Sequence, residues 1–368
     1  MKKNKLILLI IFLGVFCFVV FESVKYENNI FFQPKIEEDI VKEEIFIEEE
    51  KQIITLIAVG DISYSRGVER VVKRQNDLYY PFLKVRDYLS KSDILFGNLE
   101  TTITEGRQIL DNEMVFRSNP GTEIVLKDIG FSVLSLANNH IPDFGQKGIM
   151  DTINYLDSVG ILYVGAGENI DRANSPVYIE RGNKIFSFLA YNDSDVVPSR
   201  YEASENKGGT AFLRIDKMQE AVSLAKENSD FVIVSMHSGV EYVFEPNKNQ
   251  VNFARAAIDA GADLVIGHHP HVVQTMERYK DKYIFYSLGN FIFDQSWSEK
   301  TKEGLIVKIF FQENDVLKIE FLPVVSEKLA QPRPANSNEA KRILDRLQYD
   351  IQEEVDSYGN LVYFISNI

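Results

Sequence analysis

Three of the five histidines of this 368-residue chain fall in one tetrapeptide, His-His-Pro-His, at residues 268–271. The tetrapeptide follows a short apolar run, residues 262–266, which is typical of a buried strand that ends where the histidines begin. The other two histidines, His140 and His237, also follow apolar runs. Because ligands of α/β sheets gather where strands end, and imidazole is a common metal ligand, this placement predicts a metal site.

Oxygen-bearing side chains stand at the corresponding place after three other apolar runs. Carboxylate and amide oxygens combined with imidazoles suit a divalent ion such as Mn, Fe or Zn. A carboxylate shared by two ions holds them about 3.5–4 Å apart, as in two-metal hydrolytic sites. The sequence therefore predicts two divalent ions. The candidate ligands are Asp61, Glu100, Asn139, His237, His269 and His271.

Each of these residues, taken singly, also has an ordinary structural explanation. An aspartate after a strand, such as Asp61, commonly caps a helix or closes a turn. Glu100 would then be an exposed side chain, Asn139 would bond its own turn, and His237 would be a hydrogen-bonded core residue. The joint pattern favours the metal site, because no histidine remains for a purely structural use.

Helical periodicity separates the apolar runs, so strands and helices alternate along the chain. This alternation predicts an α/β layered core with mostly short connections, and no second domain boundary after residue 53. The predicted strands are residues 55–59, 93–96, 132–137, 161–164, 184–191, 231–236, 264–266, 282–288, 303–312 and 318–323. The predicted helices are residues 80–90, 122–129, 146–159, 217–227, 249–260 and 338–349.

Composition and charge exclude several classes of function. The formal net charge is −14 and the isoelectric point is about 5.0, which argues against a non-specific nucleic-acid binder, because such a protein needs a basic face; a local basic pocket stays open as an alternative. The single cysteine, Cys17, rules out an intrachain disulfide and lies within the first apolar run. The chain has no Gly-x-Ser-x-Gly motif either, so a covalent serine or cysteine nucleophile is not expected.

The beginning of the chain is predicted to be addressed to a membrane. Three lysines at residues 2–5 precede an unbroken apolar run, residues 6–21, close to the minimum of about 17 residues that spans a bilayer. The lysines favour a cytoplasmic N-terminus and place the rest of the chain outside. A cleaved signal peptide is the alternative, although the run lacks small residues at a cleavage point.

Three parts are therefore expected. Residues 1–25 form a cytoplasmic tip and transmembrane anchor, residues 26–52 an acidic linker, and residues 53–368 a globular domain that ends in a helix. The linker is rich in glutamate, which favours a solvated tether over the alternative, a helix that binds a partner.

Six short motifs resemble, in their order, those of the CapA family, the capsule and poly-γ-glutamate biosynthesis proteins with a calcineurin-like metallophosphoesterase fold. The resemblance covers residues 53–334 and implies a layered sandwich of two central mixed β-sheets flanked by helices. The motifs are Gly60-Asp61, Gly97-Asn98-Leu99-Glu100-Thr101, Ala137-Asn138-Asn139-His140, His237-Ser238-Gly239-Val240-Glu241-Tyr242, Gly267-His268-His269-Pro270-His271 and Ser287-Leu288-Gly289-Asn290-Phe291.

The resemblance also implies a role for each matching residue. Asp61 would be the first metal-binding aspartate, Glu100 the bridging carboxylate and Asn139 the amide ligand. His140 would contact the oxyanion and protonate the leaving group. The three imidazole ligands would be His237, His269 and His271. Arg66 and His268 would bind the substrate, and Glu241 and Asn290 would orient the ligands. For Arg66, a solvated arginine at a helix start is the alternative.

Two positions depart from the wider phosphoesterase pattern. Ser63 stands where that superfamily has the histidine of Asp-x-His, so one ion has a poorer ligand set. Glu100 stands where the superfamily has a bridging aspartate. Both departures resemble the CapA subgroup, and both put standard phosphatase activity in question.

Two hypotheses of function follow. In the first, the protein is a membrane-anchored, extracytoplasmic dinuclear-metal hydrolase acting on a phosphoester or on an amide of an anionic polymer. In the second, it is a non-catalytic accessory subunit that holds metal and binds the polymer or its membrane-embedded synthase. An acidic polymer is repelled by a chain of charge −14, so binding would run through bound cations or a local basic patch.

Overall fold

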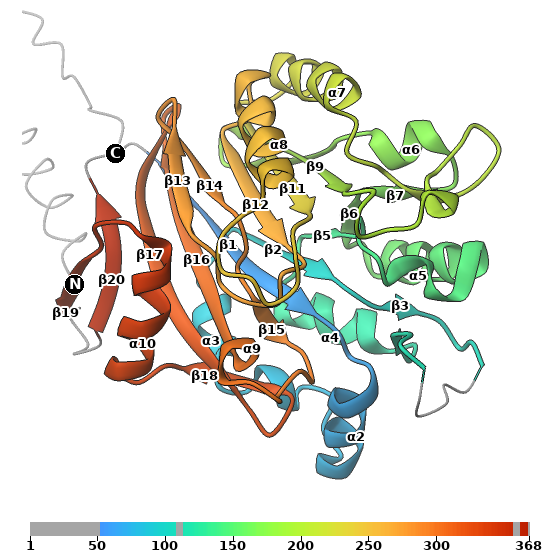
Figure 1. The fold of residues 1–368 in the computed structure, drawn as a ribbon, viewed down its shortest axis with the longest axis horizontal. Coiled ribbons are helices and arrows are strands. Elements are labelled where there is room, and N and C mark those ends of the chain that lie inside the picture. Colours follow the sequence, from blue (N-terminus) through green and yellow to red (C-terminus); the bar gives the residue numbers. More distant parts are fainter. Residues whose placement is uncertain (1–51, 108–112, 356–360, 367–368) are drawn as a thin grey trace, which may run out of the picture. The chain divides into compact units, whose positions relative to one another are not determined.

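In the computed structural model, the described residues are 52–107, 113–355 and 361–366. Two β-sheets face each other and helices cover their outer faces (Figure 1). Both sheets are mixed, so the predicted α/β fold with two mixed sheets is confirmed. The anchor predicted for residues 1–25, and the linker except residue 52, lie outside the described residues. Within the described ranges, no helix has the length and apolar character needed to cross a membrane.

The first sheet runs in the order β19-β20-β17-β16-β1-β2-β5-β6, with β15 added beside β1 and β18 beside β17. Strands β1, β2, β5 and β6 are parallel, and β16 onward are antiparallel. The strands are β1 (Ile53–Ile62), β2 (Ile94–Leu99), β5 (Val133–Ser135), β6 (Leu162–Val164), β15 (Asn290–Ile292), β16 (Glu303–Gln312), β17 (Asp315–Glu327), β18 (Gln331–Pro334), β19 (Gln352–Val355) and β20 (Leu361–Ser366).

The second sheet runs in the order β13-β14-β12-β11-β9-β8, with parallel strands at its centre and an antiparallel strand at each edge. Its strands are β8 (Val177–Arg181), β9 (Lys184–Asn192), β11 (Phe231–His237), β12 (Leu264–His268), β13 (Met276–Tyr279) and β14 (Lys282–Phe285). Two short pairs complete the strands: β3 (Thr102–Ile103) with β4 (Arg117–Ser118), and β7 (Ala166–Gly167) with β10 (Gly209–Thr210).

Most predicted helices are present with nearly the predicted bounds. The helices are α2 (Arg66–Gln75), α3 (Arg86–Leu89), α4 (Thr122–Ile129), α5 (Gly145–Val159), α6 (Ile170–Asn174), α7 (Ile215–Glu227), α8 (Lys248–Asp259), α9 (Glu299–Lys302) and α10 (Ser337–Leu344). The single helix predicted for residues 80–90 is wrong: a 3-10 turn, η1 (Tyr80–Phe82), precedes the short α3. Pro81, which lacks an N–H, is tolerated only in the first turn of a helix, which fits this short segment.

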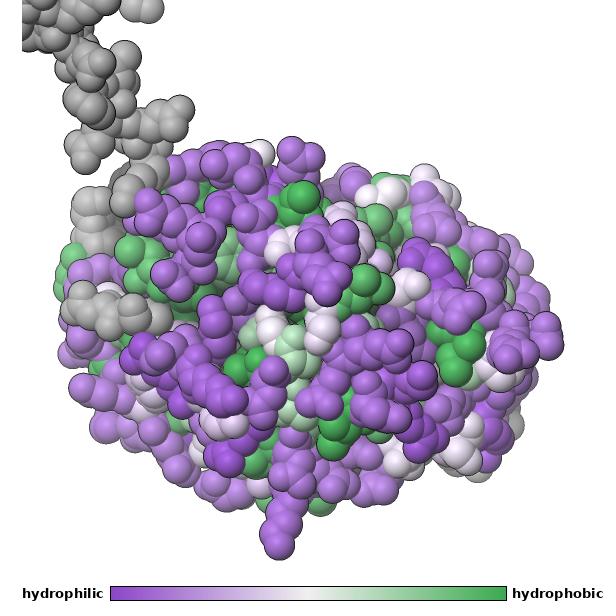
Figure 2. Space-filling model, turned by 90° about the horizontal axis from the view of Figure 1, so that it is seen from above, coloured by the Kyte–Doolittle hydropathy of each residue, from purple (hydrophilic) through white to green (hydrophobic). Residues whose placement is uncertain are grey.

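Side-chain alternation along the strands builds the layers. In β1, Leu56 and Ala58 belong to the core between the sheets, while Ile57 and Val59 face the core under helices α2, α4 and α5. A strand buried on both faces reads as a continuous apolar run, which is why these strands stood out in the sequence. On the outer face that Figure 2 shows, hydrophilic residues predominate and hydrophobic ones form small separate groups.

Glycines let the backbones of neighbouring segments approach closely just before two site residues. A Cβ on Gly60 would lie 1.9 Å from the carbonyl oxygen of Gly289, and one on Gly267 would lie 2.0 Å from that of Tyr286. The first contact brings the β15 segment against β1, so that Asp61 pairs with Asn290 in the ladder, and the second holds the end of β12 against the segment that follows β14. The two glycines therefore set how closely the strand ends converge.

Helix α10 and the turn after it are joined to the first sheet by a buried carboxylate. Glu303, fully buried at the start of β16, accepts a hydrogen bond from Arg342 Nε at 2.6 Å and pairs with Arg346. A buried carboxylate needs such partners, because an unpaired charge away from water is very costly. The C-terminal helix is thereby fixed beside the segment that leads into β16.

Candidate metal centre

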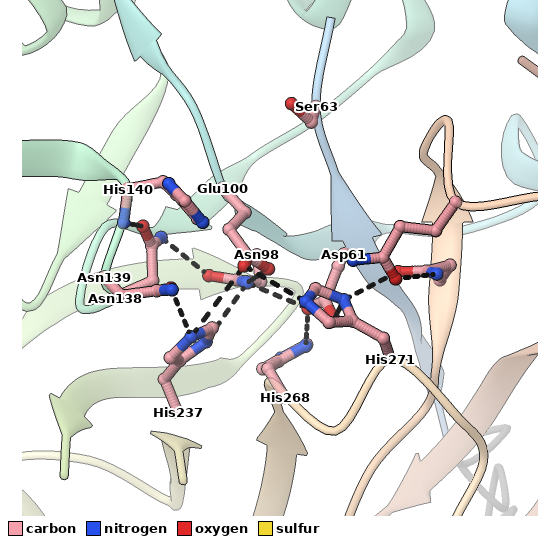
Figure 3. Close-up of polar contacts among 12 residues, drawn as sticks. Asp61, Ser63, Asn98, Glu100, Asn138, Asn139, His140, His237, His268 and His271 are labelled. Carbon is pink, nitrogen blue, oxygen red and sulfur yellow. Dashed lines mark hydrogen bonds and ion pairs between the residues drawn. The ribbon is translucent and has the colours of Figure 1, made fainter. Parts of the chain in front are cut away.

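The predicted ligands come together where strands of both sheets end (Figure 3). Asp61 is the next-to-last residue of β1, Glu100 follows β2 directly, and His237 is the last residue of β11. Asn139 lies in the turn after β5. Since these strands are parallel to their neighbours within each sheet, their carboxyl ends share one rim, as the sequence predicted.

His269 and His271 reach the site from a strained turn. Both have left-handed backbones, with φ of 98° and 56°, on either side of Pro270. A non-glycine residue in this region costs about 1–3 kcal/mol and persists only where its surroundings hold it. The turn therefore stores strain that aims two imidazoles at the cluster.

Six of the converging side chains offer metal-binding atoms. Glu100, His269 and His271 form one group whose ligand atoms lie within 4.8 Å of one another, and Asp61, Glu100 and His237 form a second. Glu100 belongs to both groups, and its Oε1 lies 4.0 Å from His237 Nε2 and 3.7 Å from His271 Nε2, so this carboxylate stands between them. Asn139 joins them, because its Oδ1 lies 2.9 Å from His237 Nε2.

Buried atoms without a partner support this interpretation. Asp61 Oδ2, Glu100 Oε1 and His269 Nδ1 are buried and have no hydrogen-bond partner in the structure. Buried polar atoms almost always have a hydrogen-bond or metal partner. Several unpartnered ligand atoms gathered at one place therefore indicate a binding site for an ion. Oxygen and imidazole nitrogen atoms suit a divalent transition metal. The residues present therefore fit the ions that the sequence predicts.

The two buried carboxyls have opposite pKa shifts. Burial would raise the pKa of Asp61, but the His268 imidazole, whose Nδ1 lies 3.1 Å from Oδ1, and the nearby His271 imidazole, 3.4 Å from Oδ2, hold it well below its usual range. Burial, followed by the charge of Asp61, raises the pKa of Glu100 well above its usual range. Two carboxylates this close avoid sharing negative charge unless a cation lies between them. A bound cation would take the place of the proton on Glu100.

Two of the candidate ligand imidazoles, those of His237 and His269, are held neutral. Burial, followed by the charge of His269, lowers the pKa of His237 well below its usual value. Burial, followed by the charge of His271, lowers the pKa of His269 to about 3. A neutral imidazole keeps the lone pair that binds a metal, so both residues are ready to act as ligands at neutral pH.

Asn98 is a central residue that the sequence analysis did not single out. Its Nδ2 donates to Asp61 Oδ1 at 2.8 Å and lies 3.2 Å from Glu100 Oε2, while its Oδ1 accepts from Asn138 Nδ2 at 3.0 Å. Asn98 and Glu100 are two residues apart, the spacing that places side chains on one face of a strand. From the sequence alone, this two-residue spacing could have identified Asn98 as a neighbour of the Glu100 carboxylate.

His140 lies beside Asn139 at the edge of the cluster, with 13% of its side chain exposed (Figure 3). Its Nδ1 is 2.8 Å from Asp143 Oδ2, and its ring stacks on Phe116 with centroids 3.6 Å apart. Asp143 also accepts from the Phe116 backbone N–H at 2.6 Å. The carboxylate fixes the imidazole, which leaves His140 Nε2 to meet a substrate. The three-residue spacing of His140 and Asp143 was a signal that sequence reasoning passed over.

Arg66, predicted to bind substrate, lies on the other face of the Phe116 ring, 4.0 Å from its centroid. It pairs with Asp294, which also accepts the Gly67 backbone N–H at 2.9 Å. The side chain of Arg66 is 18% exposed and its Nε has no hydrogen-bond partner. The alternative of a freely solvated arginine therefore does not hold.

The remaining predicted residues differ in their placement. Asn290 Oδ1 lies 2.9 Å from His271 Nδ1, as a residue that orients a ligand should. His268 is fully buried, with Nδ1 3.1 Å from Asp61 Oδ1, so it sits behind the carboxylate and not on the substrate side. Glu241 is exposed, interacts with Tyr242, and contributes with its charge to the raised pKa of Glu100. His268 is therefore placed against Asp61 where contact with a substrate was expected, and the orienting role of Glu241 stays a prediction.

Ser63 does not replace the missing histidine ligand. Its hydroxyl lies 2.8 Å from that of Ser65, and Figure 3 shows it apart from the cluster. An ion beside Asp61 would therefore have no ligand from Ser63, and the prediction of a poorer ligand set for one ion stays a prediction.

Comparison with known proteins places the chain among capsule-related sequences. The sequence model of the bacterial capsule synthesis protein PGA_cap matches residues 55–295. The chain is 35% identical to the capsule biosynthesis protein CapA of Bacillus anthracis over 296 residues, 78% of this chain and 71% of that protein. It is 33% identical to the PGA biosynthesis protein CapA of Bacillus subtilis over 302 residues, 81% of this chain and 78% of that protein.

Similar solved structures are more distant. A novel phosphatase from Mycoplasma pneumoniae has a TM-score of 0.48 and 14% identity, over 81% of this chain and 99% of that one. A calcineurin-like phosphoesterase from Bacillus subtilis has a TM-score of 0.41 and 9% identity, over 81% of this chain and 97% of that one.

Proposed function

Because the chain belongs to the bacterial capsule synthesis protein family (PGA_cap), which its CapA relatives represent, we propose that it acts in capsule or poly-γ-glutamate synthesis or export. In that process it catalyses a metal-dependent hydrolysis. The favoured substrate is a phosphoester, and the alternative substrate is an amide of the polymer. The observation that carries the proposal is Glu100, which belongs to both groups of candidate ligands.

The site supports hydrolysis without a covalent nucleophile. The six candidate ligands would hold two divalent ions, most suitably Mn, Fe or Zn, which would supply an acidified water and a positive charge beside the attacked group. His140 donates the proton that the departing oxygen or nitrogen needs, through the Nε2 that Asp143 leaves free. Asn98 holds Asp61 and Glu100 in place. Arg66 provides a positive charge on the His140 side of the site.

The place of action is part of the same proposal. The lysines and apolar run at residues 2–21 support a single membrane anchor with the domain outside the cell, where a surface polymer is assembled or exported. The membrane-embedded polymer synthase would be its partner. A protease added to intact cells tests this: an extracytoplasmic domain is digested, whereas a cytoplasmic one is protected until the cells are opened.

The test of the activity uses the full chain in detergent. Metal content is measured by mass spectrometry and hydrolysis is assayed on phosphoesters, for the wild type, Asp61→Ala and His140→Ala. Asp315→Ala, which removes an exposed carboxylate at the start of β17, is the matched control. We expect Asp61→Ala to lose metal and turnover, His140→Ala to lose turnover alone, and the control to keep both. A fully metal-loaded wild type without turnover refutes the hydrolase.

The second candidate is an accessory subunit that holds metal and binds the polymer or the synthase without catalysis. Ser63 favours it, since an ion at that position would lack the histidine that Ser63 replaces. Cells carrying Asp61→Ala or His140→Ala separate the two functions. Loss of surface polymer with both substitutions supports catalysis, while loss with Asp61→Ala alone supports a role of the metal in binding.

A further inference from the structure

The rim of the site beside His271 carries exposed apolar side chains. They come from two segments, the one that follows β11 and the one that follows β15. Large apolar groups exposed together beside a functional site usually mark a binding surface. The exposed fractions are Val240 53%, Tyr242 38%, Val243 43% and Trp297 63%.

Tyr242 is held against the metal ligands at a cost in backbone strain. Its ring stacks on that of His271, with centroids 6.3 Å apart and an angle of 28° between the planes. Its φ is +66°, which is unusual for a bulky residue, and its N–H donates to the Pro270 carbonyl at 2.8 Å. Strain of this kind is typical of functional positions.

Trp297, the only tryptophan of the chain, continues the surface that Tyr242 begins. Their rings meet at 81° with centroids 6.0 Å apart. Gln295 Nε2 lies 3.5 Å from the Tyr242 hydroxyl, and Gln295 Oε1 accepts from Asn290 Nδ2 at 3.2 Å. Since Asn290 also contacts His271, the two aromatic rings are joined to the metal centre by a continuous set of contacts.

We propose that Tyr242 and Trp297 form an aromatic wall that binds a ring of the substrate while its anionic group lies at the candidate metal ligands. The inference rests on the proposed function and names its substrate class: a phosphoester whose organic part carries an aromatic or sugar ring. Both kinds of ring present a flat face that packs on tryptophan and tyrosine. The wall leaves the His140 side of the site open for proton transfer.

The experiment uses non-hydrolysable phosphonates, so that binding is measured apart from activity. The full chain in detergent, loaded with Zn²⁺, is titrated by calorimetry with benzylphosphonate, a C-glucosyl phosphonate and propylphosphonate. We expect at least one ring-bearing phosphonate to bind about tenfold more tightly than propylphosphonate, on the scale of measured ring stacking. The aromatic and sugar arms distinguish the two kinds of ring. Because Trp297 is the only tryptophan, its emission should also shift to shorter wavelength.

Variants make the assignment specific. Trp297→Ala should reduce the preference for a ring to within about twofold and leave propylphosphonate binding unchanged, whereas Trp297→Phe should retain most of the preference. Tyr178→Ala, which removes an exposed tyrosine from β8, is the control and should behave as wild type. Equal binding of all three phosphonates, or a preference that survives Trp297→Ala, overturns the aromatic wall alone. If none of the three phosphonates binds, both the proposed phosphoesterase function and the proposed aromatic wall are refuted.

Discussion

Replacing Asn290 by alanine should weaken metal binding through a residue that is not itself a ligand. Asn290 is 2% exposed, and its Oδ1 lies 2.9 Å from Nδ1 of His271. An acceptor at this place fixes the tautomer and orientation of the ring, and its loss costs about 10- to 100-fold in metal affinity. In free energy this is about 1.4–2.8 kcal/mol.

The same substitution should also reduce the stability of the metal-free chain. Asn290 Nδ2 donates to the Thr301 carbonyl at 2.9 Å and to Gln295 Oε1 at 3.2 Å. Leaving a buried acceptor without its donor costs about 1–3 kcal/mol. Asn290→Asp separates the two effects. It keeps the acceptor for His271, so metal affinity should stay within about tenfold of wild type, but it loses the amide donor and should share the loss of stability.

The assay is a competition titration with a fluorescent chelator on the full chain, paired with urea unfolding without metal. Gln331→Ala is the matched control, because Gln331 is 3% exposed and donates from Nε2 to the Tyr80 carbonyl at 2.7 Å, outside the site. It should lose similar stability and keep full metal affinity. The reasoning is refuted if Asn290→Ala binds metal as tightly as wild type, or if Gln331→Ala weakens metal binding equally.

Three further predictions follow from the structure. Glu303→Gln should lower the free energy of unfolding by about 3 kcal/mol, because it removes the buried negative charge that pairs with Arg342 and Arg346. The measurement is urea unfolding. Glu299→Gln, which changes an exposed side chain, is the control and should cost little in the same titration. Metal affinity should fall as pH decreases, because the raised pKa of Glu100 makes a proton compete with the ion. Calorimetry in buffers of different ionisation enthalpy should then detect proton release on binding, and its absence contradicts this prediction. Asp143→Asn should lower kcat by a factor of about 10²–10⁴ with little change in metal content, since it removes the carboxylate that orients His140. An unchanged kcat would argue against His140 as the proton donor.

The buried strands and their ends were predictable because they are continuous apolar runs. Asp61, Glu100 and His237 follow such runs, and the rule that parallel strands end at one edge was enough to bring them together. The antiparallel part of the first sheet was less visible. Strands β18 and β20 are short or partly exposed, so their pairing with β17 depends on contacts distant in sequence.

The errors within the site have a common physical reason. Which way a side chain points after a strand depends on the turn that follows, and the turn at residues 268–271 has left-handed backbones that no residue type there announces. His268 therefore faces inward to Asp61, although its neighbours face the cluster. Asn98 lies within β2, two residues before Glu100; this spacing was not used, and its two bonds to carboxylates show what the side chain does.

All five histidines of the chain lie in or against this one site. A sample labelled with nitrogen-15 only in its histidine rings would thus give a magnetic resonance spectrum of the metal centre without background from the rest of the protein. Filling the centre ion by ion would change the ring signals in an order that assigns each ligand. A polyhistidine purification tag would remove this advantage, and a different affinity handle preserves it.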